Sequence, residues 1–178
     1  EAMPEEAPAP EIAPAPAASV AADAPKSAGG RQNYNVETWL ETRENLPAYA
    51  LTAFGEGHLR DFIEEAKETF ENLSDGLLEL EKNPNNPEQV NDLFRYFHNL
   101  KGNSGIVGFL EVNSLTHEAE TLLNAVRKDG YPVTSPLVDM LLLAVDVLEA
   151  LVYRIDVPAG QVAPFDASEL LEKLRQAV

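Results

Sequence analysis

Residues 87–108 read PEQVNDLFRYFHNLKGNSGIVG, and apolar side chains recur in this stretch at the three- and four-residue spacing of an α-helix. The apolar positions are Val90, Leu93, Phe94, Phe97 and Leu100. Gly102, Gly105 and Gly108 follow, although each glycine costs a helix up to about 1 kcal/mol relative to alanine. The stretch therefore predicts a core helix that begins near Pro87 and carries glycines for a reason other than its own stability.

Three other segments show the same helical spacing, and we expect them to form long helices over about 58–82, 111–129 and 137–155. A short fifth helix is expected after Ser168, which is a candidate N-cap. No segment alternates like a strand. Long amphipathic helices with short connections predict an all-α fold, an antiparallel four-helix bundle with an additional short C-terminal helix and an N-terminal helical extension.

The composition divides the chain into four parts. Residues 1–32 are rich in alanine and proline, which predicts a semi-stiff disordered linker. Residues 33–56 are expected to form a helical extension, 57–156 the four-helix bundle, and 157–178 the C-terminal capping helix. Because the chain begins at Glu1 without a signal pattern, we expect it to be a piece of a longer protein.

The extension carries a proline and a tryptophan that could define its structure. Pro47 could open a second short helix there. Trp39 could anchor the extension to the main domain, and the alternative is that this segment is a partly ordered end of the linker.

The charge and the apolar content exclude several classes of function. A net charge of −17 repels nucleic acids and anionic membrane surfaces. No apolar run approaches the roughly 20 residues that a membrane-spanning helix needs, and the chain has no cysteine for disulfides or thiolate metal sites. We therefore expect a cytoplasmic protein that binds neither nucleic acid nor membrane, and a monomer as an isolated domain.

The predicted helix over the opening stretch places a polar group of residues on one face. At 100° per residue, Phe94, His98, Lys101, Gly102 and Gly105 fall within about a third of the helix circumference. His98 lies roughly 110° from the centre of the core stripe, so we expect its imidazole at the edge of the buried face, where water or a partner reaches it.

This arrangement suits a phosphoryl group. A neutral imidazole is nucleophilic near neutral pH, because the ordinary pKa of histidine is about 6.5. Lys101 could balance the charge of the phosphoryl group, and Gly102 leaves backbone without a side chain beside the ring. A carboxylate on the other ring nitrogen would fix the tautomer, and Glu118 and Glu120 are both candidates, because they flank the apolar stripe of their helix on opposite sides.

At these residues the sequence resembles a known family. HNLKGNSGIVGF resembles the H-x-x-K-G-x-x-x-x-x-G signature of histidine phosphotransfer (HPt) domains, and THEAETLL is similar to the third helix of the phosphoacceptor P1 domain of CheA-type chemotaxis kinases. The resemblance covers about residues 57–156. It implies a phosphorelay module, not an autonomous enzyme, that needs no cofactor, receives a phosphoryl group from the catalytic domain of a histidine kinase and passes it to the aspartate of a response-regulator receiver domain.

The resemblance also implies a role for individual residues. His98 is the implied phosphoacceptor, Lys101 supports the phosphoryl group, and Gly102 clears space for an incoming domain. His117 and Glu120 match the polar pair of the third helix, with Glu120 as the implied partner of the imidazole.

Three other interpretations compete with this one. The Glu-x-x-His pairs of metal-binding bundles do not occur here, so no metal site is expected. GNSGIVG is neither G-x-G-x-x-G nor a P-loop, which disfavours a nucleotide site. A helical docking bundle without phosphoacceptor activity is the remaining alternative. His58, at a helix start, is expected to be a polar or capping residue.

Overall fold

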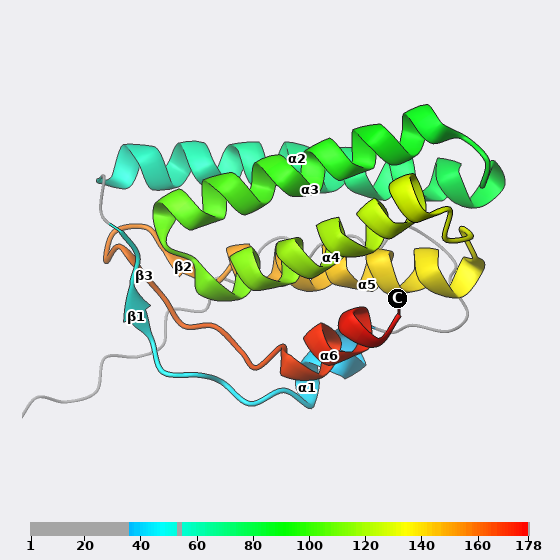
Figure 1. Ribbon diagram of the computed structural model, residues 1–178. Coiled ribbons are helices and arrows are strands. Elements are labelled where there is room, and N and C mark those ends of the chain that lie inside the picture. Colours follow the sequence, from blue (N-terminus) through cyan, green and yellow to red (C-terminus); the bar gives the residue numbers. More distant parts are fainter. Residues whose placement is uncertain (1–35, 53–54, 178) are drawn as a thin grey trace, which may run out of the picture. The chain divides into compact units, whose positions relative to one another are not determined.

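The computed structural model describes residues 36–52 and 55–177, and this part of the chain is mainly helical (Figure 1). The predicted linker over 1–32 lies outside the described residues. The helices are α1 (Val36–Glu41), α2 (Glu56–Lys82), α3 (Pro87–Val107), α4 (Leu110–Asp129), α5 (Ser135–Val152) and α6 (Ser168–Gln176). The strands are β1 (Tyr49–Ala50), β2 (Ile155–Asp156) and β3 (Gln161–Val162). The predicted four-helix bundle is confirmed as α2 to α5.

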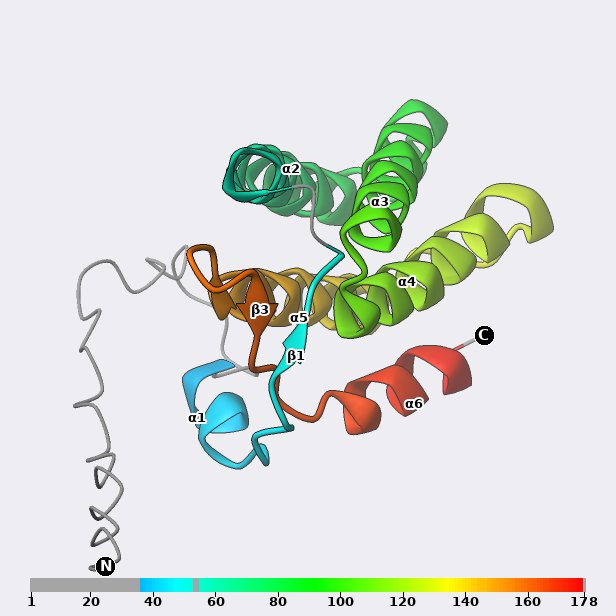
Figure 2. The ribbon, with the colours of Figure 1, turned by 90° about the vertical axis from the view of Figure 1, so that its left-hand side faces the viewer.

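One hydrophobic core fills the space between the four long helices, which Figure 2 shows from one end. Leucines with no exposed surface come from all four helices, among them Leu73, Leu93, Leu122 and Leu148. Gly76 lets α2 and α3 approach closely, because a β-carbon there would lie 2.9 Å from Cδ2 of Leu93. The apolar stripes read from the sequence thus form the interior of the bundle.

The amino end of α3 has a side-chain cap. Asn86 precedes α3, and its side-chain oxygen accepts the backbone N–H groups of Glu88 and Gln89, so the predicted helix start near Pro87 is confirmed. The N-cap of α2 is Gly55, and His58 is the third residue of the helix, so its role as a polar or capping residue stays a prediction.

Gly108 ends α3 and explains the last of the three glycines in the opening stretch. Its φ of 75° lies in the left-handed region, where a residue with a side chain is strained. A β-carbon at Gly108 would also lie 2.6 Å from Oγ1 of Thr52. The glycine therefore both stops the helix and makes room for the chain that precedes the bundle.

A small antiparallel sheet joins the segments before and after the bundle. Its order is β1-β3-β2, and Val162 of β3 is opposite Tyr49 on one side and Ile155 on the other. The second helix predicted at Pro47 is therefore wrong, because the chain after Pro47 is extended and leads into β1. The predicted helix end at Ile155 is also too late. Strands of two residues cannot show alternation, so the sequence gives no signal for them.

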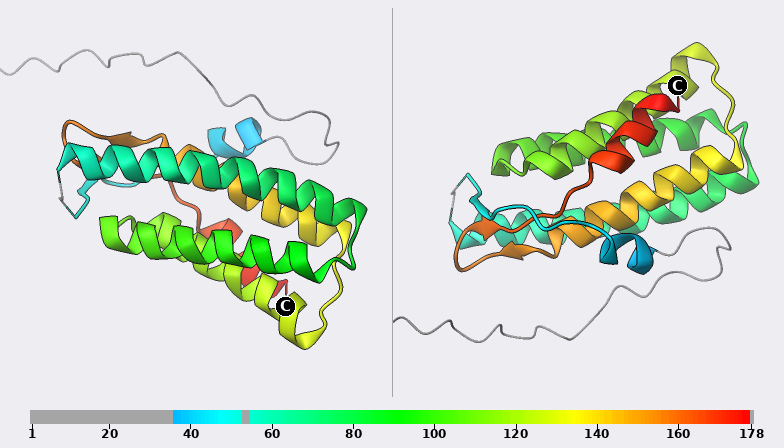
Figure 3. Two further views of the ribbon diagram at one scale, coloured as in Figure 1. Left: turned by 90° about the horizontal axis from the view of Figure 1, so that it is seen from above. Right: turned by 90° about the horizontal axis from the view of Figure 1, so that it is seen from below.

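The short helices cover one side of the bundle, where α6 packs on α4 and α1 packs on α5 (Figure 3). The N-cap of α6 is Ala167, so the predicted cap at Ser168 is wrong, and Ser168 is the first residue of the helix. Trp39 packs against the core and meets the Phe165 ring edge-on at 6.2 Å, which confirms it as an anchor of the extension. None of the helices in the described residues combines the length and hydrophobicity that a membrane-spanning segment requires.

Candidate functional site

The packing of α3 turns His98 outward. The helix buries Leu93, Phe97 and Leu100 in the core, each at most 2% exposed. The His98 side chain lies beside this face and is 58% exposed, as the helical spacing predicts. The imidazole is therefore open to solvent although its helix is part of the core.

Glu120 reaches His98 from the neighbouring helix α4. Its Oε1 lies 3.0 Å from Nδ1 of His98, and its Oε2 lies 2.6 Å from Nζ of Lys101. The carboxylate itself is only 13% exposed. The structure thus brings His98, Lys101 and Glu120 together into one cluster across α3 and α4.

The protonation state of Glu120 follows from these contacts. Burial raises the pKa of its carboxyl, but the hydrogen bonds from Lys101 and His98 lower the pKa by more, so the net pKa is below the ordinary value. Glu120 is therefore ionised near neutral pH. An ionised carboxylate only accepts hydrogen bonds, so Nδ1 of His98 carries the hydrogen. The lone pair is then on Nε2, the ring nitrogen that faces away from Glu120.

Gly102 leaves open space one turn after His98. A β-carbon added to Gly102 would have no other heavy atom within 4 Å. At Gly105 the added β-carbon would lie 3.3 Å from Nδ2 of Asn113, so that position is closer to α4. Of these two glycines, Gly102 has the freer approach from solvent.

The other two candidates on α4, Glu118 and His117, have other contacts. Oε1 of Glu118 accepts a hydrogen bond from Nε of Arg175 in α6 at 2.9 Å. Nδ1 of His117 is 3.8 Å from the same carboxylate oxygen, and the ring is 60% exposed. Of the two glutamates left open by the sequence, only Glu120 contacts His98, and His117 is oriented towards Glu118.

Asn113 and Ser104 support the same part of α3 and carry no clear signal in the sequence. Nδ2 of Asn113 donates to the carbonyl oxygen of Lys101 at 2.8 Å, and Oγ of Ser104 donates to the same oxygen at 3.0 Å. Ser104 is fully buried. The Asn113 bond ties the last turns of α3 to α4 next to the His98 cluster, and the Ser104 bond lies within α3.

The amino end of α4 is held by Tyr49, from outside the bundle. The N-cap residue Phe109 makes no side-chain cap bond. Instead, the Tyr49 hydroxyl accepts the backbone N–H of Leu110 at 3.0 Å and donates to Oε2 of Glu111 at 2.6 Å. Burial and the neighbouring Glu111 carboxylate raise the pKa of Tyr49. The Tyr49 hydroxyl thus caps the amino end of α4, although the two are far apart in the sequence.

Comparison with known proteins relates this four-helix bundle, with its surface histidine and partly buried carboxylate, to phosphotransfer domains. The Hpt domain family model matches residues 58–156. The chemotaxis protein CheA of Listeria monocytogenes is 40% identical over 113 residues, which cover 64% of this chain and 18% of that protein. The CheA of Borreliella burgdorferi is 37% identical over 65% of this chain and 13% of its own length.

Solved structures show the same relationship. The CheA phosphotransferase domain from Thermotoga maritima is 39% identical, with a TM-score of 0.54 over 57% of this chain and 96% of that domain. The phosphorylated P1 domain of CheA3, solved in complex with CheY6 from R. sphaeroides, is 25% identical, with a TM-score of 0.59 over 68% of this chain and 95% of that domain. This chain belongs to the Hpt domain family, and it is a histidine phosphotransfer module of two-component signalling. It spans less than a fifth of the length of the two CheA relatives.

Proposed function

We propose that His98 is the phosphoacceptor of this module and that Nε2 is the nitrogen that carries the phosphoryl group. The observation that supports this most directly is the 3.0 Å contact between Nδ1 and Oε1 of Glu120. A histidine hydrogen-bonded through Nδ1 to a carboxylate has its free lone pair on Nε2 and is a better nucleophile. Its 58% exposure lets another domain reach it.

The reaction then has two steps. Nε2 attacks the terminal phosphorus of a nucleotide bound to a kinase, the N–P bond forms, and the P–O bond breaks with its electron pair on the leaving nucleoside diphosphate. In the second step, an aspartate oxygen of a receiver domain attacks the same phosphorus, and the electron pair of the N–P bond returns to Nε2. The hydrogen stays on Nδ1 throughout and is donated to the Glu120 carboxylate.

Lys101 and Gly102 serve the transferred group and the incoming domain. The Lys101 ammonium is paired with Glu120, within the same cluster as the imidazole, and is positioned to balance the additional negative charge on a phosphorylated ring. The empty space over Gly102 admits the loops of a partner. In-line phosphoryl transfer depends mainly on such positioning.

The partners implied by this chemistry are a histidine kinase catalytic domain and a receiver domain, and the site of action is the cytoplasm. A protein with this P1-type fold has been solved in complex with CheY6, which supports a receiver as the second partner. We assign the phosphotransfer bundle to residues 57–156, with 33–56 and 157–178 as accessory segments. His117 is assigned a supporting role at the surface of α4, one turn before Glu120.

Labelling with a phosphoryl donor tests the assignment against a docking bundle that carries no phosphoryl group. The wild-type chain should acquire a label that is lost in acid and kept in alkali, because a phosphoramidate bond is acid-labile. His98→Gln should acquire none and keep its helical circular dichroism. His117→Gln is the matched control and should still be labelled. Label on His98→Gln would show that His98 is not the acceptor.

A further inference from the structure

His98 has a second neighbour that the phosphoacceptor chemistry alone does not require. The Phe94 ring, one turn earlier on α3, lies nearly parallel to the imidazole, with an interplanar angle of 16° and ring centroids 6.0 Å apart. The guanidinium of Arg127, from α4, lies over the Phe94 ring at 3.9 Å from its centroid. Arg127, Phe94 and His98 thus form a continuous stack that bridges the two helices of the site.

We infer that Phe94 and Arg127 are positioning residues for the reaction of His98: the stack fixes the plane of the imidazole, and Arg127 holds Phe94 in place. This inference rests on the proposed role of His98 as the phosphoacceptor. Phe94 and Arg127 touch neither the phosphoryl group nor its donor in this scheme. They act only through the orientation of the ring.

The exposure of the imidazole makes such a support necessary. Because the His98 side chain is 58% exposed, the core does not hold the ring. The hydrogen bond to Glu120 restrains one atom of the ring, Nδ1, at its edge. A parallel aromatic neighbour restrains the ring plane instead, so the two contacts together direct the Nε2 lone pair.

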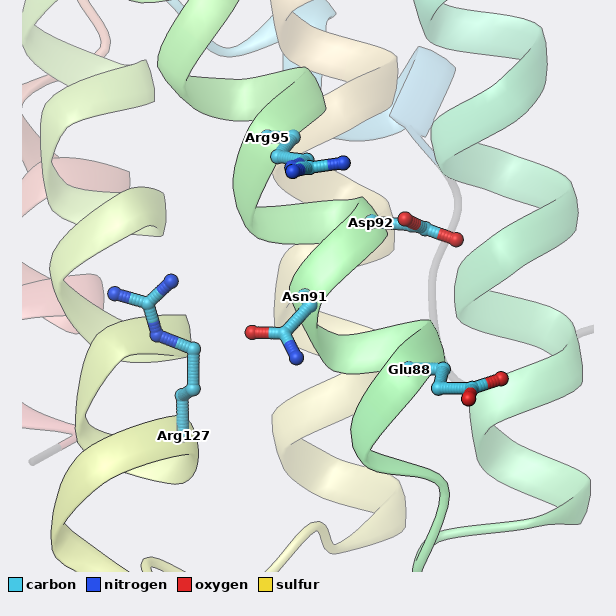
Figure 4. Close-up of a pocket in the computed structure, with 5 residues that line it drawn as sticks. All are labelled: Glu88, Asn91, Asp92, Arg95 and Arg127. Atoms are coloured by element: carbon cyan, nitrogen blue, oxygen red, sulfur yellow. The ribbon is translucent and has the colours of Figure 1, made fainter.

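Arg127 is held in a position that suits this role. Its Nη2 donates to Oδ1 of Asn124, one turn earlier on α4, at 3.0 Å. Figure 4 shows the Arg127 side chain running along the edge of α4 that is next to α3, while Glu88 and Asp92 point away from it. These residues, with Asn91 and Arg95, line a polar cavity of about 580 Å³. The guanidinium thus has two recorded contacts, the hydrogen bond to Asn124 and the Phe94 ring.

The spacing on α4 offers a signal for Arg127 that sequence reasoning did not use. Arg127 follows Glu120 by seven residues, which is two helical turns, so the two side chains lie on the same face of α4. On α3, Phe94 precedes His98 by four residues, which is one turn. The stack is therefore encoded by two ordinary helical spacings on facing helices.

The test combines chemical phosphorylation with nuclear magnetic resonance of the imidazole. Phosphoramidate is the donor, since this small molecule transfers a phosphoryl group to histidine with loss of ammonia and needs no docked partner. Arg127→Gln should lower the phosphorylation rate about 2- to 5-fold, the factor expected for an exposed cation–π contact. Phe94→Leu removes both contacts and should lower the rate about 5- to 50-fold. The ¹⁵N signals of His98 should show a smaller fraction of the Nδ1–H tautomer in both variants.

Two sets of controls separate positioning from other effects. Lys128→Gln removes a neighbouring exposed cation of α4 and should phosphorylate at the wild-type rate. Arg127→Lys and Phe94→Tyr restore a cation and an aromatic ring, and each should recover most of the rate. A merely structural role would lower the thermal midpoint without changing the tautomer or being rescued in this way.

Specific results would overturn the inference. Equal slowing by Lys128→Gln and Arg127→Gln would mean that Arg127 only attracts the anionic donor. Wild-type rates and unchanged His98 signals in Phe94→Leu would remove the stack from the mechanism. If the wild-type chain itself accepted no label, the proposed function would fail, whereas the tautomer measurement on the unphosphorylated chain would still report whether the stack orients the ring.

Discussion

Glu120 and His98 lie 22 residues apart on different helices, and their side chains meet at 3.0 Å. The contact exists because α3 and α4 pack side by side and both turn a polar edge to the same side. Glu118, only two residues earlier, faces α6 and pairs with Arg175 instead. Two glutamates of the same chemical type therefore have different roles, set by their side of one helix.

Removing each glutamate should separate these roles. Glu120→Ala should slow phosphorylation of His98 by about 10- to 100-fold, because the imidazole loses the partner that fixes its tautomer. Glu118→Ala is the matched control, since it removes the same group from the opposite side and should change the rate by less than about 2-fold. Single-turnover labelling measures both. A larger effect of Glu118→Ala would move the tautomer role to Glu118.

The pH dependence of the free energy of unfolding should also reflect the ionisation of Glu120. Its folded pKa is lowered from the ordinary value of 4.5, so the ionised carboxylate stabilises the folded state above about pH 4.5. This stabilisation is lost as pH falls through the lowered folded pKa. The free energy of unfolding of wild type and Glu120→Gln should therefore differ most near neutral pH and converge in acid. Denaturant titrations between pH 3 and 7 give the comparison, and a difference that grows in acid would contradict the assigned shift.

Three glycines should respond in different ways to alanine. Gly102→Ala should stabilise the bundle by up to about 1 kcal/mol, because the site is helical and open. Gly76→Ala should destabilise it, because the new β-carbon would meet Leu93 and Gln89. Gly108→Ala should destabilise it as well, since φ is 75° and Thr52 is too close. Thermal midpoints of the three variants test this order.

Substitutions of Gly102 should also separate effects on stability from effects on function. Gly102→Gln should fold, because its side chain points into open space, but it would obstruct the approach of a receiver to His98. Transfer from phosphorylated His98 to a receiver should then fall about 10²-fold, the effect of an offset of about 1 Å. Phosphoramidate labelling, which needs no docking, serves as the control and should change little. Wild-type transfer by Gly102→Gln would show that close approach over this residue is not required.

Loss of the Tyr49 hydroxyl should weaken the start of α4. Tyr49→Phe removes the only side-chain acceptor recorded for the Leu110 N–H in the described residues and should cost about 1 kcal/mol of unfolding free energy. Tyr131→Phe, at an exposed tyrosine, is the control and should cost little. Chemical denaturation measures both, and equal stabilities of the two variants would argue against the capping role.

The titration of Tyr49 gives an independent reading of the same contact. Because its folded pKa is raised, the neutral hydroxyl contributes stability in full below the ordinary tyrosine pKa of about 10, and the contribution is lost as pH rises through the folded value. In the folded protein, the absorbance of ionised tyrosine at about 295 nm should show a late phase that belongs to Tyr49. That late phase should be absent from Tyr49→Phe.

Local sequence patterns predicted the features that depend on one helix, such as which of its faces is buried. They did not predict the contacts between segments that are distant in the sequence. The stripe through Leu93 and Phe97 was sufficient to orient α3 and to place His98 at the surface. The choice between Glu118 and Glu120 needed the neighbouring helices, because both flank the same stripe. The capping of α4 by Tyr49 could not be predicted, since nothing near Leu110 in the sequence indicates which residue accepts its N–H.

The small sheet could not be predicted from the sequence for a related reason. Its strands have two residues each, so they cannot show alternation, and β1 pairs with β3, which lies far later in the chain. Pro47 is compatible with either structure, because a proline is tolerated both at the start of a helix and before a strand. The partner strand, β3, decides between the two.

The position of the Tyr49 hydroxyl determines where this module can be truncated or fused to another protein. The family match begins at residue 58, yet the group that caps α4 lies before it, and Val162 and Phe165, both buried, lie after its end at 156. A fragment trimmed to the match would expose apolar side chains and leave the start of α4 uncapped. The smallest fragment that folds when it is moved into another protein should therefore span residues 36–177. Chimeras that contain a shorter fragment should aggregate or lose activity.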